Sequence, residues 1–311
     1  MIDALSKAVF GTLAGSAALK GVASRYGMRG RGGFARRFVA GETIDEAIGA
    51  ARAVEAQGLS QTLDLLGESV ASEAEAVAAT EAYLAMMPRI AEAGIGRNIS
   101  IKLTQLGLDL SPELAGTHLR RILSHGAELG FFVRIDMENS PYVEATLALF
   151  EAVWRDGLTN VGVVLQSALK RSEADLERVL ALGARVRLVK GAYKEPAAVA
   201  WQSKAEVDGA YVRMLDRLLR AGHFPAIATH DPEMIAETKR LAAAAGVPAG
   251  AFEFQMLYGV RRDLQAALRA EGFGMRVYIP YGREWFPYFM RRLGERPANV
   301  GFVLKSLLRE R

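Results

Sequence analysis

The sequence predicts an α/β protein of the (β/α)8 TIM barrel class with a short helical extension before the barrel. Two observations carry this prediction: the chain contains eight short strand-like runs, and each is followed by a longer segment with helical spacing. A length of 311 residues suits one such barrel. A doubly wound sheet is the alternative, but it usually carries a G-x-G-x-x-G fingerprint after its first strand, where this chain has "LLGES".

The first 40 residues are expected to form the helical extension, and residues 41–311 the catalytic barrel. Residues 8–19, "AVFGTLAGSAAL", are too few to cross a bilayer, so a short packing helix is predicted rather than a signal peptide. The segment 25–37, "RYGMRGRGGFARR", gathers arginines among glycines. Contact with anionic lipid and a role as a flexible basic linker both stay open for this segment.

The eight strand-like runs supply the expected barrel. Their apolar and β-branched residues are typical of buried parallel strands. Helical stretches such as 74–94 and 172–183 separate them. In chain order the predicted strands cover 61–67, 98–104, 131–137, 160–166, 184–190, 224–230, 251–257 and 275–281.

Polar residues near the strand ends mark the expected active site. Catalytic side chains of such barrels lie at the carboxyl-terminal rim, so polar residues early in a strand are poor candidates. A structural salt bridge of the rim is the competing interpretation for each residue. The late polar positions are Asp64, Glu68, Lys102, Asp136, Glu138, Gln166, Arg187, Lys190, Thr229, His230, Asp231, Gln255 and Tyr278.

The composition narrows the range of partners. Half of the residues are hydrophobic and 24% are charged, which favours a large core and disfavours disorder. The net charge of +4 is spread over the chain without an aromatic-interleaved basic motif, so no nucleic acid is expected and an acidic small molecule is the easier partner. Because the chain has no cysteine, disulfides and thiolate nucleophiles are excluded.

The rim residues bear on two kinds of barrel chemistry, a metal centre and a Schiff-base lyase. A metal centre needs several converging ligands, and His230 and Asp231 with Asp136 offer little, so no metal is predicted. A Schiff-base lyase needs a desolvated lysine at a strand end, and Lys102 or Lys190 could serve. The remaining histidines occur in helical or turn contexts and are expected at the surface: His118, His125 and His223.

The chain also carries eight ordered motifs. The first four are "GETIDEA" (41–47), "LDLLGE" (63–68), "SIKLTQLGLDLS" (100–111) and "RIDMENSP" (134–141). The last four are "RLVKGAYKEP" (187–196), "ATHD" (228–231), "FEFQMLYGVRRD" (252–263) and "YIPYGREWFPYFMRRLGERPAN" (278–299). In this order and spacing they closely resemble the monofunctional bacterial proline dehydrogenases, from about residue 38 to the carboxyl terminus.

This resemblance implies a distorted (βα)8 barrel that binds FAD non-covalently and oxidises L-proline to 1-pyrroline-5-carboxylate. The hydride would pass from the ring carbon beside the proline nitrogen to flavin N5, and a membrane quinone would accept the electrons. The resemblance also implies a cytoplasmic protein, with peripheral contact to the inner face of the cell membrane as an option.

The resemblance assigns the substrate side of the site residue by residue. Arg291 and Arg292, in the last helix, would clamp the substrate carboxylate with bidentate charged hydrogen bonds, and Glu295 would orient them. Lys102 matches the lysine of the substrate pocket. Residues expected to wall the proline ring are Leu188, Tyr193 and Tyr278.

The catalytic and cofactor residues follow in the same way. Asp136 would position Lys102 and shape the pocket floor, and Arg187 would lie beside flavin N5, where a fixed cation stabilises the reduced, anionic flavin. The FAD-binding residues implied by the resemblance are Met137, Gln166, Lys190, Gly191, Ala192, Thr229 and His230.

Three positions depart from the family pattern. Asn139 stands where an acidic residue is usual, and Ala168 and Lys170 stand where many relatives carry aromatic residues. These departures bear on the shape of the flavin site and not on its chemistry. The alternatives to L-proline oxidation are dehydrogenation of another cyclic imino acid such as hydroxyproline, the Schiff-base lyase, and, outside enzymes, a basic protein that binds membranes or nucleic acid.

Overall fold

Eight parallel strands close a barrel in sequence order, with β8 pairing with β1. The structure is a computed structural model and describes Met28, residues 33–221 and residues 223–295. The predicted barrel class and its eight strands are confirmed. The strands are β1 (Ser60–Leu65), β2 (Asn98–Ile101), β3 (Phe132–Ile135), β4 (Val161–Gln166), β5 (Arg185–Val189), β6 (Ala226–Ala228), β7 (Glu253–Leu257) and β8 (Gly274–Tyr281).

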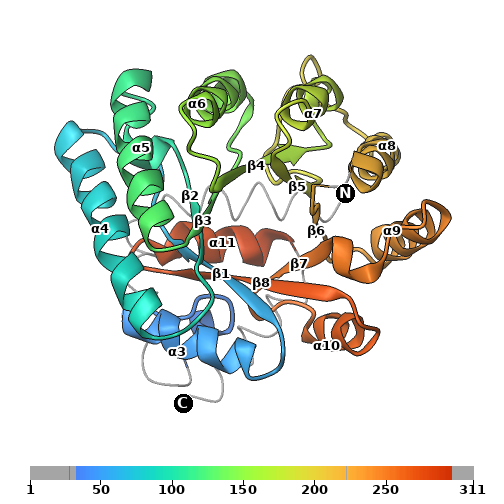
Figure 1. The fold of residues 1–311 in the computed structure, drawn as a ribbon, viewed down its shortest axis with the longest axis horizontal. Helices are drawn as coiled ribbons and strands as arrows, with labels where there is room; N and C mark the ends of the chain where they lie inside the picture. The colour runs from blue at the N-terminus through green and yellow to red at the C-terminus, as the bar shows by residue number, and fades with distance from the viewer. Residues whose placement is uncertain (1–27, 29–32, 222, 296–311) are drawn as a thin grey trace.

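Helices surround the strands, and α11 departs from this ring to lie across the barrel (Figure 1). Short 3-10 turns complete the described part of the chain: η1 (Phe34–Arg37), η2 (Thr104–Leu106), η3 (Ser140–Tyr142) and η4 (Ala249–Ala251). The α-helices are α3 (Ile44–Glu55), α4 (Glu73–Glu92), α5 (Pro112–Glu128), α6 (Val143–Arg155), α7 (Ser172–Leu180), α8 (Lys204–Ala221), α9 (Pro232–Ala244), α10 (Arg262–Ala270) and α11 (Trp285–Glu295).

Several helices begin where side chains satisfy their free backbone N–H groups. Thr43 and Glu46 form a capping box at the start of α3. Ser111 accepts from the first turn of α5, and Asp231 accepts from the first turn of α9. Both of these helices open with proline, whose fixed φ suits the first helical position. These caps set the residue at which each of these three helices begins.

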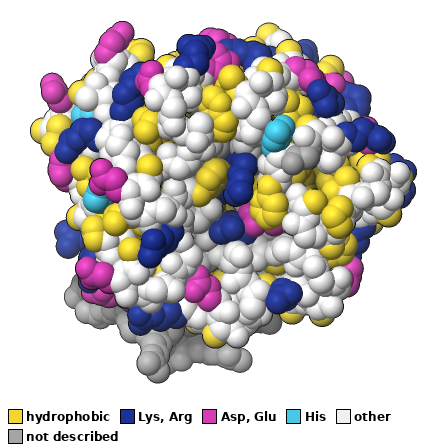
Figure 2. Space-filling model, viewed as in Figure 1, with side chains coloured by type: hydrophobic (Ala, Val, Ile, Leu, Met, Phe, Trp, Pro, Cys, Tyr) yellow, Lys and Arg dark blue, Asp and Glu magenta, His cyan; other side chains and the backbone are white. Residues whose placement is uncertain are grey.

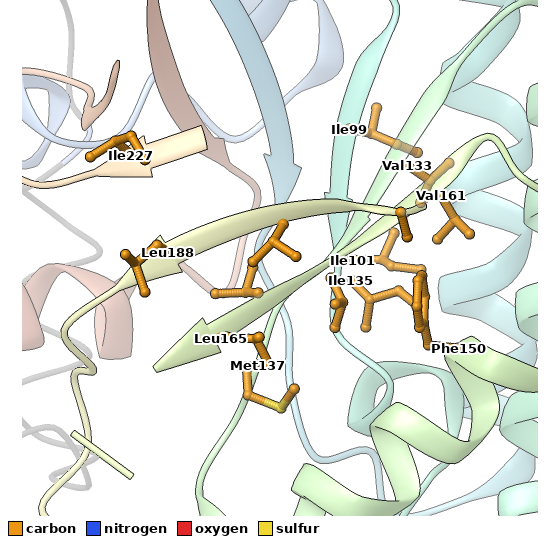
Figure 3. Close-up of a cluster of buried hydrophobic side chains, with 14 of the residues drawn as sticks. Ile99, Ile101, Val133, Ile135, Met137, Phe150, Val161, Leu165, Leu188 and Ile227 are labelled. Carbon is orange, nitrogen blue, oxygen red and sulfur yellow. The ribbon is translucent and has the colours of Figure 1, made fainter. Parts of the chain in front are cut away.

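The main core lies between the barrel and the helices. Side chains that alternate outward from the strands, such as Ile99, Val133 and Leu188, are fully buried with Phe150 of α6 in the same core (Figure 3). The inward-facing positions differ, because several carry charge. Arg187 of β5 reaches Ser100 of β2, which requires both side chains to lie inside the barrel. The apolar pattern therefore builds the outer layer, and the barrel interior holds polar chemistry.

A second apolar cluster joins the start of the described chain to α11. Phe38 lies 6.3 Å from Phe289 between ring centroids, and Trp285 lies 5.9 Å from the same ring. The backbone N–H of Ala40 donates to Pro280 O at 2.9 Å, which anchors this segment to the end of β8. The helical extension predicted for residues 1–40 falls mostly outside the described residues.

The described part of the basic segment 25–37 is tied to the protein. Arg36 forms an ion pair with Glu46 at 2.6 Å and donates to Met28 O at 3.1 Å. Arg25, Arg29 and Arg31 lie outside the described residues. Within the described ranges, no helix combines the length and the apolar character needed to cross a bilayer.

Candidate active site

A cavity of about 430 Å³ opens at the carboxyl-terminal ends of the strands, under α11. Figure 2 shows basic side chains near the centre of the face viewed down the barrel, flanked by hydrophobic ones. The cavity collects side chains from strand ends and from α11, as the barrel prediction requires. Its predicted lining residues are Lys102, Asp136, Met137, Gln166, Arg187, Lys190, Gly191, Ala192, Tyr193, Thr229, His230, Tyr278, Arg291 and Arg292.

Arg187 is fixed from three sides. Its Nε donates to Gln255 Oε1 at 2.6 Å, its Nη1 to Asp136 Oδ1 at 2.7 Å, and its Nη2 to Ser100 Oγ at 3.3 Å. The guanidinium also lies 5.3 Å from the centroid of the Tyr278 ring. A cation held in this way is preorganised, so it can stabilise negative charge in the cavity without rearranging.

Lys102 lies between two carboxylates. Its Nζ is 3.6 Å from Asp64 Oδ1 and 3.9 Å from Asp136 Oδ2. Burial alone would lower the pKa of Lys102, but Asp64 and then Asp136 outweigh it, and the pKa of the ammonium is raised. A Schiff-base lysine needs the opposite shift, so the structure disfavours Lys102 as a nucleophile. Burial raises the pKa of Asp64, and Lys102 opposes that rise.

Two tyrosines wall the cavity as neutral phenols. Tyr278 donates its hydroxyl to Asp136 Oδ2 at 2.7 Å, and burial followed by Asp136 holds its pKa well above the ordinary value. Tyr193 follows β5 and is partly exposed at the cavity edge. Burial raises the pKa of Tyr193 to about 12, although Lys102 opposes the rise. Both residues therefore offer an apolar ring with a polar edge at neutral pH.

The paired arginines of α11 both line the cavity but have different surroundings. Arg291 Nη1 binds Glu68 Oε1 at 2.8 Å, and Arg291 also borders a second cavity of about 420 Å³ beside Leu66 and Glu68. Arg292 is buried, with its guanidinium 5.0 Å from the centroid of the Tyr288 ring. Two cations of α11 thus line the same cavity as Lys102.

The segment after β5 packs closely on the end of β4 at Gly191. Gly191 has φ +115°, a value that favours glycine. A Cβ at Gly191 would come within 3.1 Å of Gln166 Oε1 and 3.3 Å of the Ala168 side chain. Gln166 is itself held because its Nε2 donates to Glu138 O at 2.7 Å. Its φ value and these close neighbours therefore both favour glycine at this position of the cavity wall.

Lys190, Thr229 and His230 meet at the far side of the cavity. Lys190 Nζ is bound by Asp208 at 2.5 Å and by Asp231 at 2.6 Å. His230 Nε2 accepts the Leu257 N–H at 3.0 Å, which leaves Nδ1 as the nitrogen that can carry a proton in the neutral ring. With two carboxylates on Lys190, this lysine too is poorly placed for Schiff-base chemistry.

Of the predicted substrate residues, Leu188 lies away from the cavity, and the Glu295 side chain is not among the described residues. Leu188 neighbours Arg187 in β5, and strand alternation directs its fully buried side chain into the core on the helix side (Figure 3). It does not line the cavity. Glu295 ends α11, and its side chain lies outside the described part of the molecule. Among the described side chains, Glu68 is a carboxylate that binds Arg291.

Two of the three positions that depart from the family pattern, Ala168 and Lys170, hold the segment after β5 in place. Ala168 N donates to Lys190 O at 2.8 Å, and Lys170 Nζ donates to Ala197 O at 2.7 Å. Lys170 also lies 5.5 Å from the Trp201 ring centroid. These contacts fasten the segment that carries Gly191 to the segment after β4. Asn139 precedes η3.

Ser100 and Tyr288 contribute to the site although the sequence did not single them out, and Gln255 was predicted only as a late polar position of its strand. Ser100 and Gln255 hold Arg187 from the middle of their strands rather than from the strand ends. Tyr288 lies beside Arg292 on α11. Helical spacing could have found Tyr288, since residues three or four apart share a helix face with the arginine pair. His118, expected at the surface, is instead buried and paired with Thr80 between α4 and α5.

Comparison with known proteins gives the family. A sequence model of the family described as proline dehydrogenase matches residues 47–305. This chain belongs to the proline dehydrogenase family. As a member of that family it is an oxidoreductase. Proline dehydrogenase 1 of Bacillus subtilis (strain 168) is 46% identical over 276 residues, which cover 89% of this chain and 91% of the relative.

Another proline dehydrogenase, from Deinococcus radiodurans, is 44% identical over 279 residues. Among solved structures, proline utilization A (PutA) from Bdellovibrio bacteriovorus, inactivated by N-propargylglycine, is similar with a TM-score of 0.79 and 28% identity. That likeness covers 84% of this chain and 32% of the PutA chain. The present chain thus spans about a third of the length of that solved relative.

Proposed function

We propose that this protein oxidises L-proline to 1-pyrroline-5-carboxylate with a non-covalently bound FAD. The observation that carries the proposal is the arrangement of cations in one cavity: Arg187 is fixed on the barrel side, and Lys102, Arg291 and Arg292 face the same space. Membership of the proline dehydrogenase family supports the choice of substrate.

The residues present fit a flavin. A flavin ring needs a flat apolar wall and a few polar groups at its edge. Met137, Val164 and Met256 supply apolar lining, and Gln166 and Arg187 supply donors. The main chain at Gly191, where a Cβ would crowd Gln166, suits close approach of a ring. When bound there, FAD supplies the hydride acceptor of the reaction.

Arg187 would support that cofactor as a fixed cation. Its three partners, Asp136, Gln255 and Ser100, prevent the guanidinium from turning away when charge develops beside it. Because the partners already satisfy its donors on three sides, the cation needs no rearrangement. We therefore assign Arg187 the role of stabilising charge on the cofactor side, and Asp136 the role of holding both Arg187 and Tyr278.

The remaining cations would bind the substrate carboxylate. Lys102 is kept protonated by Asp64 and Asp136, so it acts as a charge and not as a base. Arg291 and Arg292 offer fork-shaped donors that match a carboxylate. Arg291 is held by Glu68, so the incoming carboxylate would compete with Glu68 for this guanidinium. Tyr193 and Tyr278 would pack the ring of the substrate.

The remaining elements of the proposal come from the family resemblance. The electrons would go to a membrane quinone, from a cytoplasmic protein in peripheral contact with the inner membrane face. Arg36 of the segment 25–37 is paired with Glu46, so the other arginines of this segment are the candidates for lipid contact, since each basic residue near an anionic surface contributes about 1 kcal/mol. Vesicle sedimentation with and without these arginines would test this part separately.

Anaerobic reduction tests the main proposal. The purified protein should absorb at about 450 nm, as bound flavins do, and L-proline should bleach that band. Arg187→Met should bind proline but reduce the flavin about 100-fold more slowly, because one preorganised charge contact is lost. A protein without this absorbance band would contradict the proposal that it binds FAD. A coloured protein that L-proline leaves oxidised would remove the substrate.

A further inference from the structure

Below the cavity, the barrel interior contains a chain of buried polar side chains that continues past Arg187. Gln255 of β7 binds Arg187, and Glu253 lies two residues earlier on the same inward face of that strand. Only 6% of Glu253 and 4% of Gln255 is exposed. Glu253 does not line the cavity and has no place in the chemistry described above.

Glu253 dictates how the Gln255 amide is turned. Glu253 Oε1 accepts a hydrogen bond from Gln255 Nε2 at 2.6 Å. An ionised carboxylate can only accept, so the nitrogen of the amide must face Glu253. The amide oxygen is then left facing Arg187, where it accepts from Nε at 2.6 Å. If the amide were reversed, two donors would meet at Arg187.

The ionised state of Glu253 is itself secured. Arg276 Nε donates to Glu253 Oε1 at 2.7 Å, and Arg276 Nη1 donates to Gln61 O at 2.6 Å. Burial opposes ionisation of Glu253, but Arg276 outweighs it and the pKa of the carboxyl is lowered. Arg276, Glu253 and Gln255 thus form one connected path to Arg187.

We propose that Glu253 is a positioning residue of the reaction: it fixes the Gln255 amide so that its oxygen holds Arg187 aimed at the cavity. The inference rests on the proposed function, because it gives Arg187 its task. The competing role for Glu253 is purely structural, as the counter-charge of Arg276. The positioning role predicts that a folded Glu253 variant reduces the flavin more slowly, whereas the structural role predicts a change in stability alone.

The variant Glu253→Gln separates them. Glutamine can donate as well as accept, so position 253 no longer forces the Gln255 nitrogen toward it, and the amide is free to populate both orientations. Flavin reduction by L-proline should slow by about 10- to 100-fold, the range that a displaced catalytic group brings. The proline concentration for half-maximal rate should change little, since Lys102, Arg291 and Arg292 are untouched.

A readout without cofactor comes from the arginine side-chain ¹⁵N spectrum. The Nε–H signal of Arg187, identified by its absence in Arg187→Met, should exchange slowly with water in the unaltered protein. In Glu253→Gln it should exchange faster, because its acceptor, the Gln255 amide oxygen, is no longer held in one orientation. The exchange measurement tests the positioning role even if L-proline does not reduce the unaltered protein. That failure would contradict the proposed function but not the role of Glu253.

A swap variant tests the direction of the path. In Glu253→Gln/Gln255→Glu, the carboxylate at 255 accepts directly from Arg187 Nε and from the amide at 253, whose oxygen accepts from Arg276. Every hydrogen bond and the net charge are restored, so most of the lost reduction rate should return. Asp175→Asn is the matched control, since Asp175 is a buried carboxylate on α7, 3% exposed and bound to Arg171. It should lower stability without slowing reduction.

If Glu253→Gln does not fold, Gln255→Met takes its place. This variant leaves the pair of Glu253 and Arg276 intact and removes only the amide, so the same slowing and the same faster exchange at Arg187 are expected. Unchanged reduction together with an unchanged Arg187 signal, in whichever variant folds, would overturn the positioning role and leave Glu253 as a counter-charge.

Discussion

At the residue scale, the barrel interior is notable for its charge. Barrel interiors are usually filled with branched apolar side chains. Here the interior carries four cations and three carboxylates, five of them buried and Asp136 and Arg276 partly exposed, which leaves one positive charge in excess if all are ionised. That excess suits a substrate that brings a carboxylate. The seven residues are Lys102, Arg134, Arg187 and Arg276 with Asp64, Asp136 and Glu253.

Tyr278 should set the choice between L-proline and trans-4-hydroxy-L-proline. Its ring faces the cavity, and its hydroxyl is committed to Asp136 at 2.7 Å. The phenol would pack an unsubstituted ring and exclude an added hydroxyl. We expect a strong preference for L-proline, measured as the ratio of the two kcat/KM values. Tyr278→Ser should reduce this preference, mainly because the transition-state stabilisation for L-proline falls by about 1–3 kcal/mol.

Tyr278→Phe is the control for this comparison. It keeps the ring and removes only the hydrogen bond to Asp136, so the preference for L-proline should remain while the rate falls. Comparable efficiencies for the two substrates in the unaltered protein would overturn the choice of proline but leave the flavin barrel intact.

At the scale of elements, the connections around the site are tied down by caps and ion pairs. The capping box of α3 reaches further than usual, because Glu46 also binds Arg36 at 2.6 Å. This joins the described end of the basic segment to the first helix after it. Phe38, the residue that follows this segment, packs on α11, which carries the arginine pair. The position of α11 therefore depends on contacts with a segment near the start of the described chain.

The Glu46 capping box should give a pH-dependent contribution to stability. Burial opposes ionisation, but Arg36 and the N–H groups of Glu42 and Thr43 lower the pKa of Glu46 to about 2. A carboxyl with a depressed folded pKa stabilises the protein above its unfolded pKa of about 4.3 and loses that effect as the pH falls toward the folded value. Glu46→Gln should therefore lower the unfolding free energy at neutral pH.

Urea unfolding at about pH 7 and about pH 3 measures this effect, since the difference between Glu46→Gln and the unaltered protein should shrink in acid. Glu92→Gln, at the exposed end of α4, is the matched control and should change stability little at either pH. A difference for Glu46→Gln that is the same at both pH values would assign its effect to packing.

At the scale of the whole molecule, the cavity borders two separate apolar clusters. The core between strands and helices is apolar and continuous, and the second cluster under α11 is separate from it. The cavity joins the two at the barrel mouth. A ligand seated there contacts both the strand ends and α11, so it should stabilise the molecule as a unit.

FAD added to flavin-free protein should raise the unfolding free energy by about 2.7 kcal/mol at a concentration one hundred times its dissociation constant. Thermal unfolding at several FAD concentrations measures this. NAD at the same concentrations is the control, because it lacks the flavin ring that the Gly191 wall is expected to receive. Equal shifts with both compounds would indicate non-specific nucleotide binding, and no shift with FAD would contradict the cofactor proposal.

The sequence by itself determined the barrel, because strand alternation and helical spacing are local periodicities that survive in any context. It also placed Lys102, Asp136 and Arg187 near one opening. The tertiary structure alone decided the partners. Gln255 meets Arg187 across 68 positions, and Glu68 meets Arg291 across 223. Such pairs depend on how the barrel closes and where α11 lies, and no local period encodes either.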